Sequence, residues 1–260
     1  MAQALLVRVR MNVSLYQAAA ALDANSHWLD VISDNLASSS VPGYRKQTLA
    51  TAAVQAGLMP VDSSGTPQHF TIPKTTDATS FKPGEMKYTG DDKNLGIEGA
   101  GFFQVQLPNG KVAVTRDGEF QVNSKGLLVT KEGYPVQGAG GPIQLDAHNA
   151  TPVSITSNGQ IFQGEDSKGT ISLTDYKNPE LLTSTNGVYF LAGNSHLKAQ
   201  PATGTVRQGY VEGSNTSSLE EMASMLTAMR TFEANQHVVQ IQDDRLGKVI
   251  SDLGNAGSSS

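Results

Sequence analysis

Two pairs of neighbouring carboxylates, Asp91-Asp92 and Asp243-Asp244, are the first residues whose types could support acid–base chemistry. Side chains that are adjacent in sequence point in different directions, so neither pair by itself forms a general acid and its base. We interpret both pairs as solvated surface, the first in a turn and the second on a helix. The sequence therefore predicts no catalytic residue and no enzyme activity.

Metal and phosphate chemistry have equally little support. The five histidines lie far apart, and no two have the spacing of metal ligands: His27, His69, His148, His196 and His237. The segment Gly96-Ile-Glu-Gly99-Ala-Gly101 is rich in glycine, but it matches neither nucleotide-binding pattern and precedes an aromatic strand rather than a helix. We interpret it as a turn or a close approach of the backbone, and we predict no metal and no cofactor.

The composition of the chain argues against nucleic acids and membranes as binding partners. The 260-residue chain has a formal charge of −5, so it lacks the basic surface that neutralises nucleic-acid phosphates. No apolar stretch reaches the roughly 18 residues of a membrane span, and Met1 to Arg10 lacks the apolar run of a cleaved signal peptide. The absence of cysteine excludes disulfides and thiolate metal sites. We expect no nucleic-acid partner and no membrane insertion.

The elements that position these side chains begin with a helix. Residues 1–42 contain no glycine, and apolar residues recur there at alternating spacings of three and four, which predicts a helix over 14–38. Ser14 and Gln17 resemble a capping box, and Pro42-Gly43 stops the helix. The stripe comprises Leu15, Ala18, Leu22, Asn25, Leu29, Ile32 and Leu36.

The C-terminal end repeats the pattern in a second glycine-free segment, 219–246. Ser218 and Glu221 form a second possible capping box, and Gly254 to Ser260 is expected to be a frayed tail. The second stripe comprises Met222, Met225, Met229, Phe232, Gln236, Val239, Asp243, Leu246, Ile250 and Leu253. Both stripes need burial, either against each other as an antiparallel hairpin within one molecule or also between molecules.

Between the helices the chain has the pattern of antiparallel β-structure. Phe103, Val105 and Leu107 alternate with polar residues, and Pro108-Asn109-Gly110 predicts a hairpin with a type I′ turn. Similar turn signals recur at short intervals up to Gly159. We predict a β-rich domain over 85–211. Residues 45–84 carry few large apolar groups and are predicted to form an extended connector.

The predicted fold class is therefore α+β, with the N- and C-terminal helices pairing as a coiled coil beside a central antiparallel β-rich domain. The expected segments are 1–44 (N-terminal extension and helix), 45–84 (connector), 85–211 (β-rich domain), 212–254 (C-terminal helix, which joins 1–44 in a helical axial domain) and 255–260 (tail).

Several motifs resemble those of the flagellar rod and hook protein family. Residues 33–47 contain an Asn-Leu-Ala run followed by a Gly-aromatic turn, and 209–215 and 230–235 match the C-terminal signature. Residues 99–103 and 115–120 resemble the β-domain motifs. Residues 82–90 and 133–143 are closer to the proximal rod protein than to the distal one. Family members begin near Met11, so Met1 to Arg10 is expected to be an upstream extension or a misassigned start.

The resemblance implies a structural subunit of the bacterial flagellar basal-body rod. Such a subunit passes, without cleavage, through the flagellar type III export apparatus and polymerises with itself and with other rod and hook subunits in the periplasm-spanning rod. The connector turn is expected at Pro42, Gly43 and Tyr44. The expected assembly interface comprises Leu15, Leu22, Leu29, Ile32, Asn35, Leu36, Met222, Met225, Met229, Phe232, Asn235, Val239 and Leu246.

A second class of function stays open at this point. A secreted β-rich module that binds or cleaves glycans, anchored by a coiled coil, would also combine these elements. No carboxylate pair or aromatic platform stands out for it, since aromatic residues make up 6% of the chain. Trp28 fits either an intersubunit anchor or a buried neighbour of Leu29.

Overall fold

The structure is a computed structural model of the chain. It describes the backbone of residues 2–59, 68–146, 151–194 and 197–256, and the side chains of 16–55, 71–146, 151–194 and 197–251. Backbone contacts divide the chain into two compact units. Unit 1 comprises residues 1–34, 48–78 and 219–260, and unit 2 comprises residues 35–47 and 79–218.

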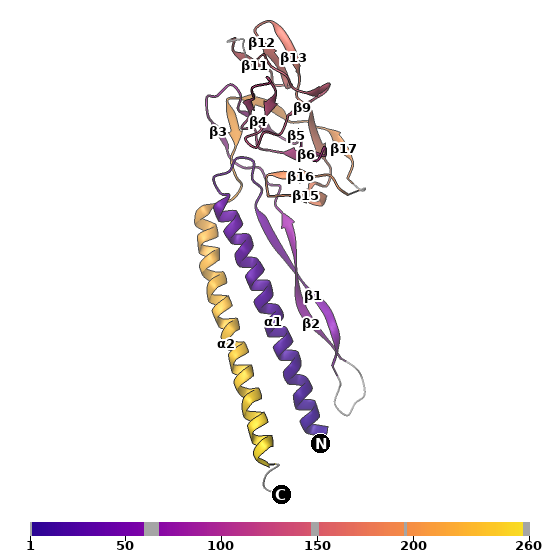
Figure 1. The fold of residues 1–260 in the computed structure, drawn as a ribbon, viewed down its shortest axis with the longest axis vertical. Helices are drawn as coiled ribbons and strands as arrows, with labels where there is room; N and C mark the ends of the chain where they lie inside the picture. The colour runs from indigo at the N-terminus through magenta and orange to yellow at the C-terminus, as the bar shows by residue number, and fades with distance from the viewer. Residues whose placement is uncertain (1, 60–67, 147–150, 195–196, 257–260) are drawn as a thin grey trace. The chain divides into compact units, whose positions relative to one another are not determined.

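Unit 1 holds two long helices and a two-stranded sheet. The helices are α1 (Ala2–Ala37, whose last turn belongs to unit 2) and α2 (Ser218–Ala256), and the strands are β1 (Gln47–Met59) and β2 (Gln68–Thr79). In Figure 1, α1 and α2 run alongside each other within this unit. The sequence thus predicted both helices, and the α+β class is confirmed.

The predicted start of the first helix is wrong. We expected residue 14, but α1 begins at Ala2. Residues 2–13 contain no glycine or proline and are rich in good helix formers, so the helix continues through the supposed capping box. The predicted end holds, because α1 stops at Ala37 and the Ser39 hydroxyl donates to the Leu36 carbonyl at 2.8 Å.

The second helix begins at Ser218 as expected and runs past Gly247 to Ala256, two residues into the predicted tail. Residues 257–260 lie outside the described residues.

The segment predicted as an extended connector contains the paired strands β1 and β2. The pattern of large apolar residues predicts no strands in this segment. Threonine, a good strand former, supplies part of the propensity instead, and the Thr48 hydroxyl donates to the Ala78 carbonyl across the pair at 3.2 Å.

Unit 2 is built around a six-stranded sheet with the order β15-β16-β6-β5-β14-β17. These strands are β5 (Phe102–Gln106), β6 (Val112–Thr115), β14 (Leu173–Tyr176), β15 (Thr183–Ser184), β16 (Tyr189–Leu191) and β17 (Ala199–Pro201). Side chains alternate across it, so Phe103 and Tyr189 enter the larger apolar core while Phe102 and Phe190 enter a smaller one on the other face. The sheet is therefore buried on both faces.

Smaller antiparallel pairs complete unit 2. They are β3 (Met86–Tyr88) with β19 (Tyr210–Glu212), β4 (Leu95–Glu98) with β18 (Thr205–Gln208), β7 (Gln121–Val122) with β8 (Leu128–Val129), β9 (Gln137–Gly138) with β10 (Gly141–Pro142), and β11 (Val153–Ile155), β12 (Gln160–Gln163) and β13 (Asp166–Thr170) in one three-stranded sheet. A short 3-10 helix, η1, spans Pro179–Leu181.

The predicted hairpin is present as β5 and β6, with Val105 opposite Ala113. Its turn type was predicted wrongly. A type I′ turn needs positive φ at two central residues, but only Gly110 has one here (φ 79°), and Asn109 does not. The Asn109 carboxamide instead accepts a bond from the Lys111 N–H at 3.0 Å, which supports a longer loop.

Candidate functional site

The two terminal motifs meet inside unit 2. Residues 35–47 and 209–218 come from opposite ends of the sequence and belong to the same compact unit as the β-structure. We call their meeting point the junction and define it by six side chains: Asn35, Tyr44, Arg45, Arg116, Glu212 and Asn215.

Asn35 closes the turn that leaves α1. Its carboxamide oxygen accepts bonds from the Gln47 N–H at 2.8 Å and the Tyr44 hydroxyl at 3.1 Å, and its nitrogen donates to the Gln47 carbonyl at 2.8 Å. Asn35 and Tyr44 are 1% and 2% exposed, so these bonds lie inside the protein. The carboxamide thus pairs with the backbone of Gln47 as a neighbouring strand would.

Gly43 permits the turn itself. Its φ of 68° lies in the left-handed region, and a Cβ at this position would overlap the backbone of Arg116 and Asp117. Its N–H donates to the Glu212 carbonyl at 2.7 Å, so the turn is bound directly to the C-terminal motif.

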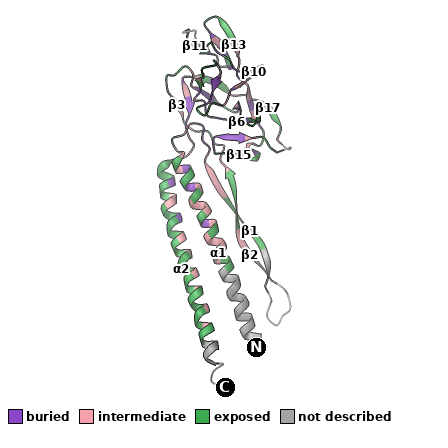
Figure 2. Cartoon of the chain, in the orientation of Figure 1, coloured by how far each residue is buried: buried purple, intermediate pink, exposed green. Residues whose placement is uncertain are grey.

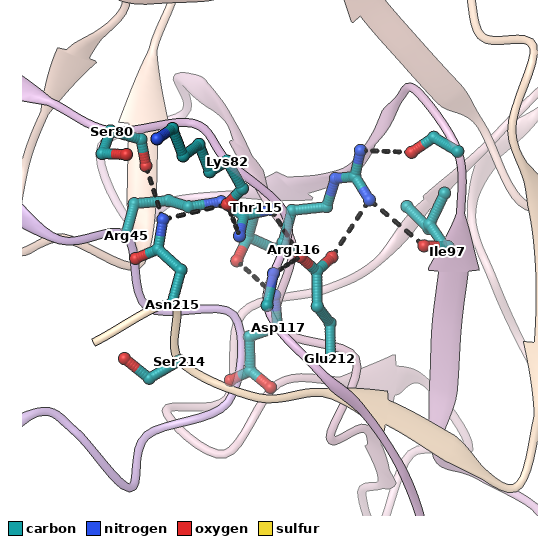
Figure 3. A network of polar contacts seen from close by, with 12 residues as sticks. Arg45, Ser80, Lys82, Ile97, Thr115, Arg116, Asp117, Glu212, Ser214 and Asn215 are labelled. Atoms are coloured by element: carbon teal, nitrogen blue, oxygen red, sulfur yellow. Dashed lines mark hydrogen bonds and ion pairs between the residues drawn. The ribbon is translucent and has the colours of Figure 1, made fainter. Parts of the chain in front are cut away.

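Three buried charged side chains join the two motifs to the β-structure, as Figure 3 shows. The Glu212 carboxylate lies between two guanidinium groups, 2.8 Å from Arg45 Nη2 and 3.0 Å from Arg116 Nη1. The Gly84 N–H also donates to it at 2.7 Å. Arg45 donates further to the Lys82 carbonyl and Arg116 to those of Ile97 and Gly99. One carboxylate therefore holds three segments of the chain.

Like Asn35 at the end of α1, Asn215 in the C-terminal motif uses its carboxamide to bind backbone groups of other segments. Its oxygen accepts from the Lys46 N–H at 2.7 Å, and its nitrogen donates to the carbonyls of Ser80 and Lys82 at 2.8 and 2.9 Å. The bond from Lys46 fixes the segment before α2 against the segment after Tyr44. The other two bonds, shown in Figure 3, hold it to residues 80–82.

Asp117, next to the junction, is a buried carboxyl with a perturbed proton affinity. It is 4% exposed and accepts a bond from the Glu119 N–H at 2.9 Å. Burial raises its pKa to about 6, because the low-dielectric interior disfavours the charged form, although the Glu119 bond opposes this. Burial likewise lowers the pKa of Arg116, against the opposing effect of Glu212.

The helix faces of unit 1 form the second candidate site, and on α1 they are clearly divided (Figure 2). We call Ala18, Leu22, Asn25, Leu29 and Ile32 the covered row of α1; they are buried or half-buried and belong to the predicted stripe. The covered face is broader than this stripe, because the residues beside it are half-buried as well: Ala20, Ala21, Ala24, His27, Trp28 and Val31. An outward row of exposed residues comprises Tyr16, Ala19, Asp23, Ser26, Asp30 and Ser33.

On α2 the covered row coincides only in part with the predicted stripe. The covered row comprises Glu221, Met225, Ala228, Phe232, Asn235, Val239, Gln242, Leu246 and Val249. Every second residue of the covered row also belongs to the predicted stripe. At the positions between them the prediction is off by one residue: it gave Met229, for example, whereas the covered residue is Ala228, which is 0% exposed. An outward row, Leu219, Met222, Leu226 and Met229, is 49–79% exposed.

Comparison with known proteins matches part of the β-structure and the C-terminal segment to flagellar families. The family described as the flagellar hook protein FlgE/F/G D1 domain matches residues 96–163, and the flagellar basal body rod FlgEFG protein C-terminal family matches 207–253. The flagellar basal-body rod protein FlgG of Buchnera aphidicola from Acyrthosiphon pisum is 31% identical, with 91% of this chain and 98% of that protein covered. The chain belongs to the flagellar basal-body rod protein family.

Rod proteins of both names, FlgG and FlgF, are similar to this chain. The FlgF of Mesorhizobium japonicum is 32% identical over 94% of this chain and 99% of its own length. The FlgF of Escherichia coli is 29% identical over 92% and 97%. Membership in the rod family makes the chain a structural subunit of the rod, and the comparisons do not favour a glycan-binding module.

Within this rod-family chain, the predicted assembly residues fall into three groups. Met222 and Met229 are exposed on the outward row of α2. Leu22, Leu29, Ile32, Leu36, Met225, Phe232, Asn235, Val239 and Leu246 are buried or half-buried, and Asn35 is buried in the junction. The side chain of Leu15 lies outside the described residues. Pro42, Gly43 and Tyr44 form the predicted turn, and their role in assembly, like that of the whole set, stays a prediction.

The rod-family motifs contain Arg45, Arg116, Glu212 and Asn215, but their local sequence pattern predicts no role for these residues. A signal was present, since an arginine stands in the N-terminal motif, another in the β-domain motif and a glutamate in the C-terminal one. Charged residues are almost never fully buried unless they are paired, so these charges permitted a buried ion pair but did not by themselves predict one.

The two pairs of neighbouring carboxylates, which we interpreted as solvated surface, are exposed in the structure. Asp91 bonds Lys93 at 2.9 Å on the surface, which lowers its pKa, and Asp243 and Asp244 are exposed on α2. His27 lies near Asp77 of β2, His237 is exposed, and the side chains of His69, His148 and His196 are outside the described residues. Among the residues with described positions, no three His, Asp or Glu side chains are grouped to hold a metal.

The glycine-rich segment 96–101 is a close approach of the backbone. A Cβ on Gly96 would overlap the Met86 side chain, and Gly99 and Gly101 have φ values of 102° and 141°. Within the described part of the chain, neither helix is long and apolar enough to cross a membrane.

Proposed function

We propose that this rod subunit polymerises through its terminal helices into a torque-transmitting shaft, and that it is not an enzyme. The outward row of α2 carries the proposal. Four large apolar side chains in three turns of one helix gain stability only when another surface covers them. Metal-dependent chemistry has no comparable support, because the described histidines and acids form no group of three that could hold a metal ion.

The covered rows of α1 and α2 support an antiparallel coiled coil within each subunit. Both rows alternate spacings of three and four, which is the repeat of a coiled-coil seam. The polar members of the two rows, Asn25 on α1 and Glu221, Asn235 and Gln242 on α2, would set the register, as polar residues do in other coiled coils.

The family resemblance extends the proposal to the whole rod. The helical ends line the inner tube of the filament, the β-structure faces outward, and the uncleaved subunit reaches the growing end through the flagellar type III export apparatus. The subunit then resides in the periplasm-spanning basal body beside other rod and hook proteins. The motifs in 82–90 and 133–143 support a place in the proximal rod.

The test is a double variant of the outward row, Met222→Asp with Met229→Asp, expressed from the native locus. We expect loss of swimming and loss of the subunit from purified basal bodies, while the near-UV circular dichroism of the purified chain shows unit 2 still folded. Thr227→Asp is the matched control, because Thr227 is exposed on α2 but lies outside both rows. Normal swimming of the double variant would contradict polymerisation through the helices.

A further inference from the structure

The outward rows of α1 and α2 differ in the size of their side chains. On α2 the row is made of leucine and methionine only. On α1 the first member of the row, Tyr16, is large, but from Ala19 onward the small residues Ala19, Ser26 and Ser33 recur every seven positions, with Asp23 and Asp30 between them. Large side chains on one helix fit between small ones on another, so the two rows are complementary in shape.

The two rows do not cover each other within one chain. Leu219, Leu226 and Ser33 are all exposed in the same compact unit. Pairing of two α1 rows is unfavourable, because it would place carboxylates opposite carboxylates. Pairing of two α2 rows would leave the α1 row uncovered. Contact of each row with its unlike row needs two chains, and such a contact produces an open filament rather than a closed dimer.

Charge at the edge of the rows agrees with this pairing. Residues 16–37 carry three carboxylates, Asp23, Asp30 and Asp34, and no lysine or arginine. On α2, exposed Arg230 directly follows Met229, and Glu233 ends the apolar row one turn later. An arginine beside the apolar row would meet the acidic face of the neighbouring α1 and fix the register.

We propose that the outward row of α2 in one subunit packs against the outward row of α1 in a second copy of this chain. The inference rests on the proposed function and names the two faces that polymerisation uses. A stable pairwise interface buries roughly 800 Å² on each partner, more than four side chains supply, so the contact forms only where a growing rod presents several contacts at once.

The chain contains no cysteine, so introduced cysteines report this contact without background. Leu226→Cys and Ser33→Cys are placed together in the native gene, basal bodies are purified and oxidised, and the products are separated without reductant. We expect bands at multiples of the chain mass that contain peptides of this chain alone, and no such bands from either single variant. Thr227→Cys with Ser33→Cys is the control, since Thr227 neighbours Leu226 but points to another side of α2 and bonds the Ala223 carbonyl.

Basal bodies that contain the subunit but give no such bands would overturn the inference and leave the proposed function intact. Equal bands from the control, or bands that join this chain to a different subunit, would overturn it as well. Absence of the unmodified chain from basal bodies would instead refute the proposed function.

If the introduced cysteines prevent incorporation into the rod, exchanging the charges of the two faces tests the same contact independently. Arg230→Glu alone and Asp23→Lys with Asp30→Lys should each abolish swimming, and the combination of all three should restore it. Failure of the combination to improve on its parts would contradict the pairing of these faces.

Discussion

Arg45 and Glu212 lie 2.8 Å apart, each 1% exposed, and join the N-terminal motif to the C-terminal one. Because Arg116 bonds the other oxygen of the same carboxylate, the β-structure is part of this link. Unit 2 therefore requires both terminal motifs, and the β-rich segment 85–211 by itself lacks Arg45 and the turn at Gly43.

Replacement of Glu212 tests the link. Glu212→Gln leaves two buried guanidinium groups without their counter-charge, and breaking a buried pair in this way costs about 3–5 kcal/mol. Urea unfolding of the full chain, followed by the near-UV circular dichroism of its tyrosines, measures the change. Glu98→Gln is the control, because its pair with Arg207 is half-exposed and contributes about 0–1 kcal/mol. Equal effects of the two substitutions would show that burial of Glu212 does not matter.

The stability of unit 2 should depend on the protonation of Asp117. Its pKa is about 6 in the folded chain against an ordinary 3.8, so folding favours the protonated form. The stabilisation is complete below pH 3.8 and is lost as the pH rises to 6, a change of about 3 kcal/mol. Asp117→Asn, which keeps the acceptor for Glu119, should remove this part of the pH dependence in urea titrations. Parallel curves for the two chains between pH 4 and 6.5 would refute the assignment.

Alanine substitutions at two glycines with positive φ distinguish the cost of backbone strain from the cost of steric overlap. Gly110→Ala meets no atom within 4 Å and should cost about 1–2 kcal/mol from its conformation alone. Gly43→Ala has the same strain and also drives a methyl group into the Arg116-Asp117 backbone, so we expect more than about 4 kcal/mol. Urea unfolding checks both, and a cost at Gly43 no greater than at Gly110 would mean that the turn yields easily.

The two faces of α2 should respond differently to charge. Ala228→Asp buries a carboxylate in the covered row and should lower the melting temperature of unit 1, which Trp28 on α1 reports by fluorescence. Met229→Asp changes an exposed residue and should alter stability by less than about 0.5 kcal/mol. Similar losses from both substitutions would contradict the division of α2 into a covered and an outward row.

Local sequence patterns were sufficient to predict the two helices, the hairpin at Gly110 and the α+β class. They could not select the covered face of α2, because the rows through Met222 and Met229 and through Glu221 and Ala228 both alternate three and four and share Met225 and Phe232. Hydrophobicity favours the methionines, whereas the close packing around Ala228 favours the other row.

The junction could not be predicted from local patterns for a related reason. Arg45, Arg116 and Glu212 are far apart in sequence, and their pairing arises from long-range contacts alone. Each carries a charge that a local rule assigns to the surface. The pair β1 and β2 was missed because threonine-rich strands give a weak apolar signal.

Electron cryo-microscopy of basal bodies isolated from the native bacterium tests the central claim, polymerisation through the terminal helices, most directly. We expect density for this chain in the rod, with α1 and α2 of neighbouring copies in contact around the axis and the β-structure outside them. A rod that lacks the chain, or in which its helices contact no other subunit, would contradict it.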